Sequence, residues 1–352
     1  MKVLFLPDWS RGGNPYQSEL AAALQKRGVT VIMGDGINWL PILGAITVHG
    51  KPDVLHFHWT HPYLLGRNRA NSFAKFIRFI SEVLFAKSLG IKVIWTVHNL
   101  WDHEKRDPQL EVFFNRFLVR IYDQLIVHCS LARKSLLQRY QLPDHLRNKI
   151  YVIPHGNYMN SYANHVTRKK ARTWLGLGYG DIVFLYFGTI RPYKGVQRMT
   201  DAFRKLNNPR ARLLIVGEPN NDTIRSELRR FCESDERIRA FLKFVPDEDI
   251  QLYMNAADVV VLPFQNILTS GSALLAMSFG KPIIVPRLGC IPEVVDKEGG
   301  FLFNHDEGQG LLSAMKQASL ANLASMGEYN YAKAKSFDWN MIAEKTHEVY
   351  QL

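Results

Sequence analysis

The stretch that decides the fold is Gly188-Thr189-Ile190-Arg191-Pro192-Tyr193-Lys194-Gly195. Before it runs Ile182–Phe187, an uninterrupted apolar segment rich in β-branched and aromatic residues, which is typical of a strand buried on both faces. After it, Val196–Phe203 has the apolar spacing of a helix. Arg191 and Lys194 therefore lie on a loop at the carboxyl end of a buried strand, where open α/β sheets bind their ligands.

A second candidate for anion binding lies further along the chain, in Thr269-Ser270-Gly271-Ser272, just before the expected helix Ala273–Phe279. Hydroxyl groups and free backbone N–H groups at the start of a helix bind anions readily, although the same residues also serve as ordinary caps. A basic loop such as Arg191–Lys194 is likewise often only a solvated surface. The two loops together, on one sheet edge, favour a bound diphosphate.

Strands and helices alternate along both halves of the chain, which predicts doubly wound α/β sheets. We expect two such domains facing each other across a cleft, over residues 1–160 and 178–336, with a polar and basic linker around 158–178. The segment 337–352 is expected to form a helix that packs back toward the first domain. The expected strands are Val3–Leu6, Val29–Met33, Asp53–Trp59, Ile91–Val97, Gln124–His128, Ile150–Ile153, Ile182–Phe187, Arg212–Val216, Asp258–Leu262 and Ile283–Val285.

The positive charge is concentrated in the first half. The net charge is +12, and residues 1–150 hold 20 Lys+Arg against 11 Asp+Glu, a balance of +9, which leaves 24 against 21, or +3, for the rest. A basic half can meet nucleic acid, an anionic membrane surface or an anionic substrate. The sequence lacks a base-stacking motif, so nucleic acid is not expected as a partner.

The compartment is predicted from cysteine usage and from apolar runs. Cys129, Cys232 and Cys290 lack the paired spacing of a disulfide framework or a zinc motif, which suits a reducing cytosol. The apolar run Val3–Leu6 is too short for a signal peptide, and no run approaches the length of a membrane span. We therefore expect a cytoplasmic protein whose contact with the inner face of the cytoplasmic membrane is peripheral.

Such a contact could involve the expected helix Asn71–Leu89. Phe73, Phe76, Ile77, Ile80 and Leu84 form one apolar stripe, while Phe79 and Phe85 fall outside it among cations. Surplus aromatic residues beside lysine and arginine are typical of a helix that lies on a membrane. The same pattern also fits a core helix with snorkelling lysines, which is the more common case. Both interpretations stay open.

Histidines follow two strands of the first half. His56 and His58 share one strand face, and with His61 they give H-x-H-x-x-H, but no cysteine or carboxylate completes a metal site. We interpret His56 and His58 as strand-end residues that face a polar cleft. The later strand Ile91–Val97 leads into a loop with two histidines and two carboxylates, which reads His98-Asn99-Leu100-Trp101-Asp102-His103-Glu104.

The second half resembles the nucleotide-sugar domain of GT-B glycosyltransferases of the family-4-like group. The motifs that carry the resemblance are Gly188…Arg191-Pro192-Tyr193-Lys194-Gly195, Val216-Gly217-Glu218-Pro219, Ala257–Pro263 and Gly280-Lys281-Pro282…Pro292-Glu293, with Asn14-Pro15-Tyr16, Asp53–Trp59, His98-Asn99 and His155-Gly156 in the first half. Retaining members carry glutamates where this chain has Ile267 and Leu275. That departure favours inversion, and a weaker similarity points to the bacterial β-mannosyltransferases of xanthan-type exopolysaccharide assembly.

The resemblance implies transfer of a hexose from a nucleoside-diphosphate sugar, with GDP-mannose favoured, to a lipid-linked saccharide, without a metal or cofactor. Glu104 is the first candidate for the general base, with Asp102, His98 and His103 as competitors. Acceptor contacts are expected from His56, His58 and Tyr16. Donor contacts are expected from Gly13, Asn14, Arg191, Lys194, Glu218, Phe244, Val245, Thr269, Ser270, Gly271 and Ser272.

Three alternatives stay open. The donor could be a UDP-sugar such as UDP-glucose, or the transfer could retain configuration. Loss of both glutamates also fits an inactive GT-B scaffold that binds a regulatory partner, although the phosphate loops and the His98–Glu104 loop favour an enzyme. A sugar epimerase with the same fold would convert its sugar without an acceptor.

Overall fold

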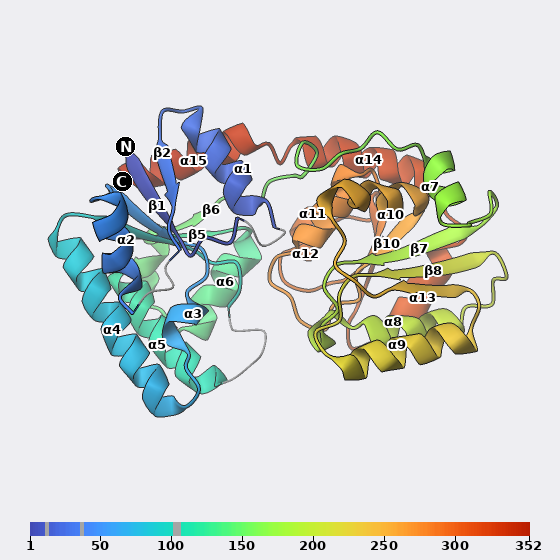
Figure 1. Cartoon of the computed structure of the whole chain (residues 1–352), viewed down its shortest axis with the longest axis horizontal. Helices are drawn as coiled ribbons and strands as arrows, with labels where there is room; N and C mark the ends of the chain where they lie inside the picture. Colours follow the sequence, from blue (N-terminus) through green and yellow to red (C-terminus); the bar gives the residue numbers. More distant parts are fainter. Residues whose placement is uncertain (11–13, 36–38, 101–106) are drawn as a thin grey trace. The chain divides into compact units, whose positions relative to one another are not determined.

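A computed structural model of the chain describes residues 1–10, 14–35, 39–100 and 107–352. These residues form two compact units. The first unit comprises Met1–Gly156 together with Asp338–Leu352, and the second comprises Asn157–Phe337. Figure 1 shows that each unit is a layer of strands covered by helices.

The first unit is built on a six-stranded parallel sheet in the order β2-β1-β3-β4-β5-β6. The strands are apolar and mostly buried because helices cover both faces of the sheet. Its strands are β1 (Lys2–Leu6), β2 (Thr30–Met33), β3 (Val54–Phe57), β4 (Lys92–Thr96), β5 (Gln124–Val127) and β6 (Ile150–Val152). Its helices are α1 (Tyr16–Gln25), α2 (Pro41–His49), α3 (His61–Leu64), α4 (Arg69–Ser88), α5 (Pro108–Ile121), α6 (Ser130–Arg139), the 3₁₀ helix η1 (Asp144–Lys149) and α15 (Trp339–Gln351).

The second unit repeats the plan with the order β12-β11-β10-β7-β8-β9, again all parallel. Read from β9, this is the 3-2-1-4-5-6 order of doubly wound dinucleotide-binding sheets. Its strands are β7 (Ile182–Phe187), β8 (Ala211–Val216), β9 (Ile238–Phe241), β10 (Val259–Val261), β11 (Ile283–Pro286) and β12 (Gly300–Phe303). Its helices are α7 (Arg168–Trp174), η2 (Pro192–Lys194), α8 (Val196–Arg204), α9 (Asp222–Ser234), η3 (Asp247–Asp249), α10 (Ile250–Ala256), α11 (Gly271–Ser278), α12 (Ile291–Val294), α13 (Gly310–Ala318) and α14 (Leu323–Lys335).

Each of the ten strands expected from the sequence is present. The two that were not expected, β9 and β12, are the edge strands of the second sheet. Edge strands need a weaker apolar pattern because one side of each is open. Arg239 interrupts the apolar pattern of β9, and β12 begins at the second residue of the glycine pair Gly299-Gly300.

The segment 158–178 is not a linker, contrary to expectation. Tyr158 and Ala171 are buried in the core of the second unit. Arg172, although charged, is also buried, and it donates to an Asp258 carboxylate oxygen at 2.5 Å and to the Ala256 carbonyl at 3.1 Å. These bonds satisfy a buried cation, so a basic sequence here belongs to the fold rather than to a solvated connection.

The last helix, α15, belongs to the first unit and packs on α1. Its buried residues Ile342, Ala343 and Val349 share a core with Leu20 and Leu24 of α1. Both chain ends therefore lie in the same unit, as Figure 1 shows.

The burial of α4 differs from the stripe expected for it. Phe76 and Phe79 are buried, whereas Phe73, Ile77, Leu84 and Phe85 are exposed. The buried face also holds Ser72 and Glu82, which the apolar pattern could not indicate. The Glu82 carboxylate accepts from the backbone N–H groups of Ile42 and Leu43 at 2.8 and 3.0 Å, and so caps the start of α2. Burial raises the pKa of this carboxyl.

Candidate functional site

The carboxyl ends of β7 and β10 are neighbours in the second sheet, at the point where the strand order reverses. In doubly wound sheets this switch point opens the crevice that binds ligands. The loop 188–195 leaves β7 here, and the loop 262–270 leaves β10 here and leads into α11. The two loops singled out from the sequence therefore meet at one place.

Two glycines fix the loop after β7. Gly188 has φ 135° and Gly195 has φ 71°, both in the region that favours glycine. A Cβ on Gly195 would lie 2.1 Å from the carbonyl oxygen of Pro263, so only glycine allows the two loops to approach this closely. The backbone N–H of Gln265 also donates to the backbone carbonyl of Tyr193 at 2.8 Å. The loops after β7 and β10 are thus held against each other.

Lys194 Nζ and Ser272 Oγ both lie beside Gly188. A Cβ placed on Gly188 would lie 3.6 Å from Lys194 Nζ and 3.7 Å from Ser272 Oγ. Within the described residues Lys194 makes no ion pair, and burial, followed by the charge of Arg191, lowers its pKa to about 8. A desolvated cation that lacks a carboxylate partner is arranged for an anionic ligand.

The start of α11 supplies further donors. Ser270 Oγ accepts from the Ala273 N–H at 3.1 Å, so this serine acts as the cap of the helix. The first N–H groups, those of Gly271 and Ser272, have no acceptor among the described residues, as expected for the first turn. Thr269 precedes them and is half-buried. The capping and the anion-binding interpretations therefore apply to different atoms of the same turn.

The other candidates of the second unit lie on neighbouring loops. Arg191 is half-buried and precedes η2, while Glu218 is exposed and its carbonyl accepts from the Ile190 N–H at 2.8 Å. Phe244 is 64% exposed, and Val245 is buried. The Phe244 side chain is therefore accessible to a ligand, whereas Val245 belongs to the core.

In the first unit the strand order reverses between β1 and β3. Trp9 follows β1 and Trp59 follows β3, and their rings stack with centroids 4.5 Å apart. The other neighbour of Trp59 is the His98 ring, stacked at 4.5 Å. Gln17 fixes this corner, because its side chain accepts from the Trp9 N–H and donates to the Pro7 carbonyl, both at 2.8 Å. The result is an aromatic stack whose outer member, Trp9, is exposed.

Behind this stack, three histidines form a hydrogen-bonded chain. His58 Nδ1 lies 3.3 Å from His98 Nε2, and His98 Nδ1 lies 3.1 Å from His128 Nε2. His128 Nδ1 lies 3.1 Å from the carbonyl oxygen of Ile153. A carbonyl can only accept, so His128 carries its proton on Nδ1, and the same tautomer follows for His98 and then for His58. His58 Nε2 is left as a bare acceptor.

Burial keeps these rings neutral. It lowers the pKa of His128 to about 4, and burial together with the neighbouring rings lowers the pKa of His58 and His98 well below the usual value. His56 and His155 are also buried, and each has its pKa lowered to about 3. The first unit therefore contains five buried, uncharged histidines at the carboxyl ends of its strands.

Burial also corrects the acceptor assignment made from the sequence. His56, His58 and Tyr16 are at most 2% exposed. His56 bonds Tyr350 Oη at 2.6 Å and Thr96 Oγ1 at 2.7 Å, so both of its ring nitrogens are engaged inside the core. Alternation along β3 correctly put the two histidines on one face, but that face is covered by α1 and α15 rather than open.

Comparison with known proteins decides the family. The family model described as "Glycosyl transferases group 1" matches residues 181–319, and "Glycosyltransferase Family 4" matches residues 34–157. A GDP-mannose:glycolipid 4-beta-D-mannosyltransferase of Xanthomonas campestris is 31% identical over 266 residues, which cover 75% of this chain and 70% of that protein. The chain belongs to these glycosyltransferases. A D-inositol 3-phosphate glycosyltransferase of Corynebacterium jeikeium is 24% identical, with 97% of this chain and 91% of that protein covered.

Solved structures agree on the GT-B fold of this glycosyltransferase. A sucrose-phosphate synthase of Thermosynechococcus elongatus superimposes with a TM-score of 0.78 at 16% identity, covering 99% of this chain and 98% of that one. The HepE protein of Anabaena, solved with UDP, gives a TM-score of 0.76 at 18% identity and covers 99% of both chains.

The remaining predicted site residues of the glycosyltransferase have different outcomes. Gly13, Asp102, His103 and Glu104 lie outside the described residues. Asn14 is exposed, and its side chain accepts from the Tyr16 N–H at 3.1 Å, at the start of α1. His98 is buried with both ring nitrogens engaged, a poor arrangement for a base. Among the described residues no group of three His, Cys, Asp or Glu side chains is placed to hold a metal.

Trp9 and Trp59 were not among the site residues predicted from the sequence. The sequence did contain an indication of them. Each tryptophan comes just after the end of a strand and is preceded by a polar residue, in Asp8-Trp9 and His58-Trp59. What the sequence lacks is the strand order, which makes β1 and β3 neighbours and so brings the two rings together.

Proposed function

We propose that the glycosyltransferase transfers a hexose, favouring mannose from GDP-mannose, to a lipid-linked saccharide in bacterial exopolysaccharide assembly. The observation that carries this proposal is Lys194, which is desolvated beside Ser272 at the switch point of the second sheet and has no carboxylate partner among the described residues. The mannosyltransferase relative, named for GDP-mannose and a glycolipid, supports the choice of donor and acceptor class.

In the proposed reaction the acceptor hydroxyl oxygen attacks the anomeric carbon of the donor. Its proton passes to the general base, which we propose to be Glu104, and the bond from the anomeric carbon to the diphosphate oxygen breaks. Negative charge then grows on the leaving diphosphate, where Lys194, Arg191 and the first N–H groups of α11 would stabilise it. Attack opposite the leaving group inverts the configuration, which suits a chain with Ile267 and Leu275 at the positions of the glutamates of retaining members.

Replacing Lys194 by alanine is expected to weaken GDP binding about 10- to 100-fold, the range for loss of a hydrogen bond to a charged group. Lys205→Ala, an exposed cation at the end of α8, is the matched control and should bind GDP normally. Titration calorimetry of both variants measures the difference. Equal affinities would remove Lys194 from the diphosphate site.

The pH dependence of GDP binding provides a second test of Lys194. Its pKa is lowered to about 8, so the free protein loses this charge as the pH rises through 8, whereas a bound diphosphate favours the charged form. GDP affinity should therefore fall above pH 8 in the wild type and stay flat in Lys194→Ala. Calorimetry in buffers of different ionisation enthalpy would detect the proton taken up on binding, and no uptake at pH 8.5 would contradict the assignment.

For the acceptor we propose the exposed ring of Trp9, backed by Trp59, as the platform on which a sugar ring stacks. An aromatic face offers apolar surface to the C–H face of a sugar, and the stack lies at the switch point of the first sheet, where ligands bind.

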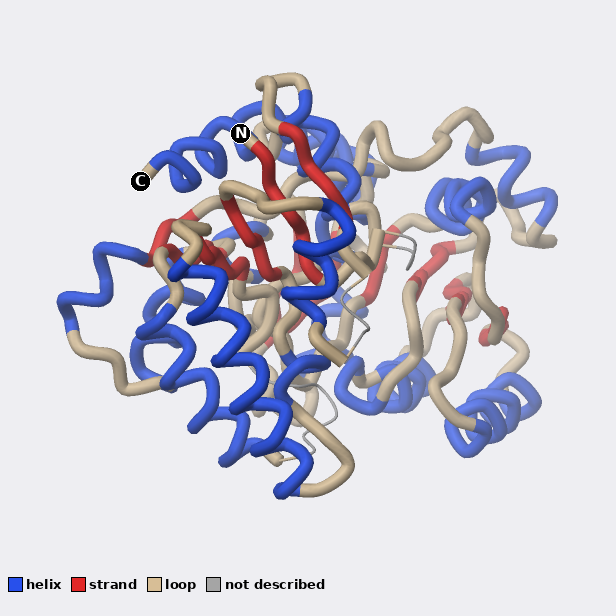
Figure 2. Tube along the Cα trace, turned by 60° about the vertical axis from the view of Figure 1, so that its left-hand side comes forward, coloured by secondary structure: helices blue, strands red, loops and turns tan. Residues whose placement is uncertain are grey.

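The membrane contact is proposed at the exposed face of α4 and α5, which lie side by side on the first unit (Figures 1 and 2). The buried rings Phe76 and Phe114 stack at 4.0 Å between the two helices. The only carboxylates within α4 and α5, Glu82 and Glu111, are both buried. We define the aromatic face as Phe73, Ile77, Leu84, Phe85, Phe113 and Phe117, all exposed.

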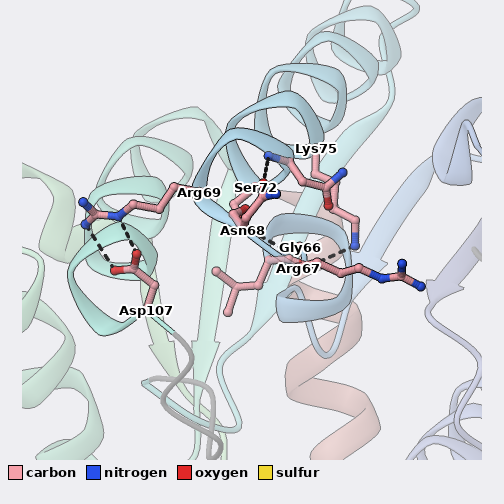
Figure 3. A pocket seen from close by; sticks show the side chains of 9 residues that line it. Gly66, Arg67, Asn68, Arg69, Ser72, Lys75 and Asp107 are labelled. Carbon is pink, nitrogen blue, oxygen red and sulfur yellow. Dashed lines mark hydrogen bonds and ion pairs between the residues drawn. The ribbon is translucent and has the colours of Figure 1, made fainter.

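Cations lie on the same two helices as the aromatic face and just before α4. Arg116 and Arg120 are exposed on α5, between and beyond its two exposed phenylalanines. A pocket of about 770 Å³ at the amino end of α4 is lined by Arg67, Arg69 and Lys75 against one carboxylate, Asp107, which binds Arg69 at 2.7 Å (Figure 3). Exposed aromatic residues with cations on the same helices fit an anionic lipid surface. No helix among the described residues has the length and hydropathy to cross a membrane.

The double variant Phe113→Ser/Phe117→Ser is expected to lose at least tenfold in partitioning to vesicles that contain anionic lipid, because two half-exposed rings no longer enter the interface. Leu320→Ser, at a 91% exposed position of the second unit, is the control and should sediment with the vesicles as the wild type does. If the double variant co-sediments equally well, the aromatic face is not the contact.

A further inference from the structure

Three side chains that line one small pocket of the first unit each have a buried polar atom without a hydrogen-bond partner among the described residues. These atoms are His58 Nε2, Trp95 Nε1 and Asn115 Oδ1. The three side chains are at most 3% exposed, and they come from three elements: the end of β3, the strand β4 and the helix α5. A buried polar atom without a partner is costly, so three around one pocket indicate a ligand that satisfies them.

The hydrogen-bonding capacity of these three atoms limits which ligand can satisfy them. The tautomer fixed by Ile153 leaves His58 Nε2 as an acceptor. Asn115 Oδ1 is also an acceptor, and Trp95 Nε1–H can only donate. The ligand must therefore donate two hydrogen bonds and accept one. A cation cannot face the indole N–H, an anion cannot donate to two acceptors, and a single hydroxyl group has only one proton to donate.

We propose that this pocket binds one ordered water molecule, which bridges His58, Trp95 and Asn115. Its volume of about 20 Å³ matches one water, for which a cavity of at least about 10–15 Å³ and 2–4 polar partners are needed. The water donates to His58 Nε2 and Asn115 Oδ1 and accepts from Trp95 Nε1–H. It extends the histidine chain to four members and ties its free end to α5.

The bridge gives the histidine chain a fixed orientation. Ile153 sets the protons at one end, and the water meets the bare nitrogen at the other, so His98 in the middle has one tautomer and one ring position. His98 also stacks on Trp59. Asn115 and Trp95 are therefore positioning residues for the aromatic stack, although neither belongs to it. The bound water can be tested independently of the transfer reaction, because the NMR experiment detects the contact between the water and the Trp95 indole directly.

The test is NMR of the full chain labelled with ¹⁵N at tryptophan and histidine. The indole proton of Trp95, assigned with Trp95→Phe, should show a cross-peak to water whose sign marks a long-lived contact rather than proton exchange. The histidine spectra should show His58, His98 and His128 all protonated on Nδ1. No such cross-peak at Trp95, or a proton on His58 Nε2, would overturn the proposal.

A variant separates the bridge from simple burial. Asn115→Leu removes the acceptor, together with the side-chain hydrogen bond of Asn115 to Tyr140, while keeping a side chain of similar size. We expect the Trp95 water cross-peak to be lost and the His58 Nε2 resonance to move. Unmoved resonances of the exposed indoles of Trp39 and Trp174 would show that the fold is intact. A cross-peak of wild-type intensity in this variant would remove Asn115 from the site and overturn the three-way bridge.

Discussion

Between pH 7.5 and pH 5 the first unit is expected to lose about 10 kcal/mol of its free energy of unfolding, enough to unfold it. His56, His58, His98, His128 and His155 are buried and neutral in the fold, with every pKa lowered. Unfolded, each titrates near 6.5, so below that pH the unfolded state binds more protons and stability falls. At pH 5 each histidine lowers the free energy of unfolding by about 2 kcal/mol, and the whole free energy of unfolding of a domain is only about 5–15 kcal/mol.

Tryptophan fluorescence measures this loss selectively. Six of the seven tryptophans lie in the first unit, and Trp174 alone lies in the second. Urea unfolding followed at pH 7.5, 6.5, 6.0 and 5.5 gives the free energy at each pH, and below 6.5 its slope should approach about 7 kcal/mol per pH unit, the value for five protons. A slope that corresponds to the uptake of one proton or less on unfolding would show that the five rings are charged or solvated in the folded protein.

The second large effect is expected from Glu104→Gln, which should lower the rate of sugar transfer by about 10²–10⁴-fold, the range for loss of a general base. The amide keeps the size of the side chain but cannot take the acceptor proton. GDP affinity should be unchanged, because the proposed diphosphate site lies in the second unit. Transfer is measured as release of GDP from GDP-mannose in the presence of membrane extract that supplies acceptor.

The neighbours of Glu104 in the loop provide matched controls. Asp102→Asn and His103→Asn remove the competing candidates one at a time and should each retain most of the activity. Full activity in Glu104→Gln would remove that residue from the role, and a large loss in Asp102→Asn instead would transfer the role to Asp102.

The fold could be predicted closely because its signals are local. Apolar runs such as Ile182–Phe187 are long enough to mark buried parallel strands, and they alternate regularly with helices. The misreadings arose where tertiary contacts override composition. Arg172 lies in the segment expected to be a linker, and it is buried because Asp258 and the Ala256 carbonyl accept hydrogen bonds from its guanidinium group. Glu82 lies on the buried face of α4 because its carboxylate caps α2, which no apolar pattern indicates.

For the candidate site, too, local features could be predicted and features that depend on tertiary contacts could not. Lys194 and Ser272 could be paired in advance because each follows a strand end, and such loops share one edge of a parallel sheet. The return of the last helix to the first domain was predicted, but the sequence does not indicate which residues this helix covers, so the burial of His56 and Tyr16 under α15 was not predicted. The stack of Trp9 on Trp59 depends on strand order, which no local pattern contains.

Titration calorimetry of the purified full chain with GDP and, separately, with UDP distinguishes the proposed GDP-mannose donor from its alternatives. We expect that GDP binds, that UDP binds more weakly, and that Lys194→Ala reduces the GDP affinity. Tight binding of UDP alone would replace the donor with a UDP-sugar. Binding of neither nucleotide by a folded sample would contradict the diphosphate site and leave the chain as an inactive scaffold.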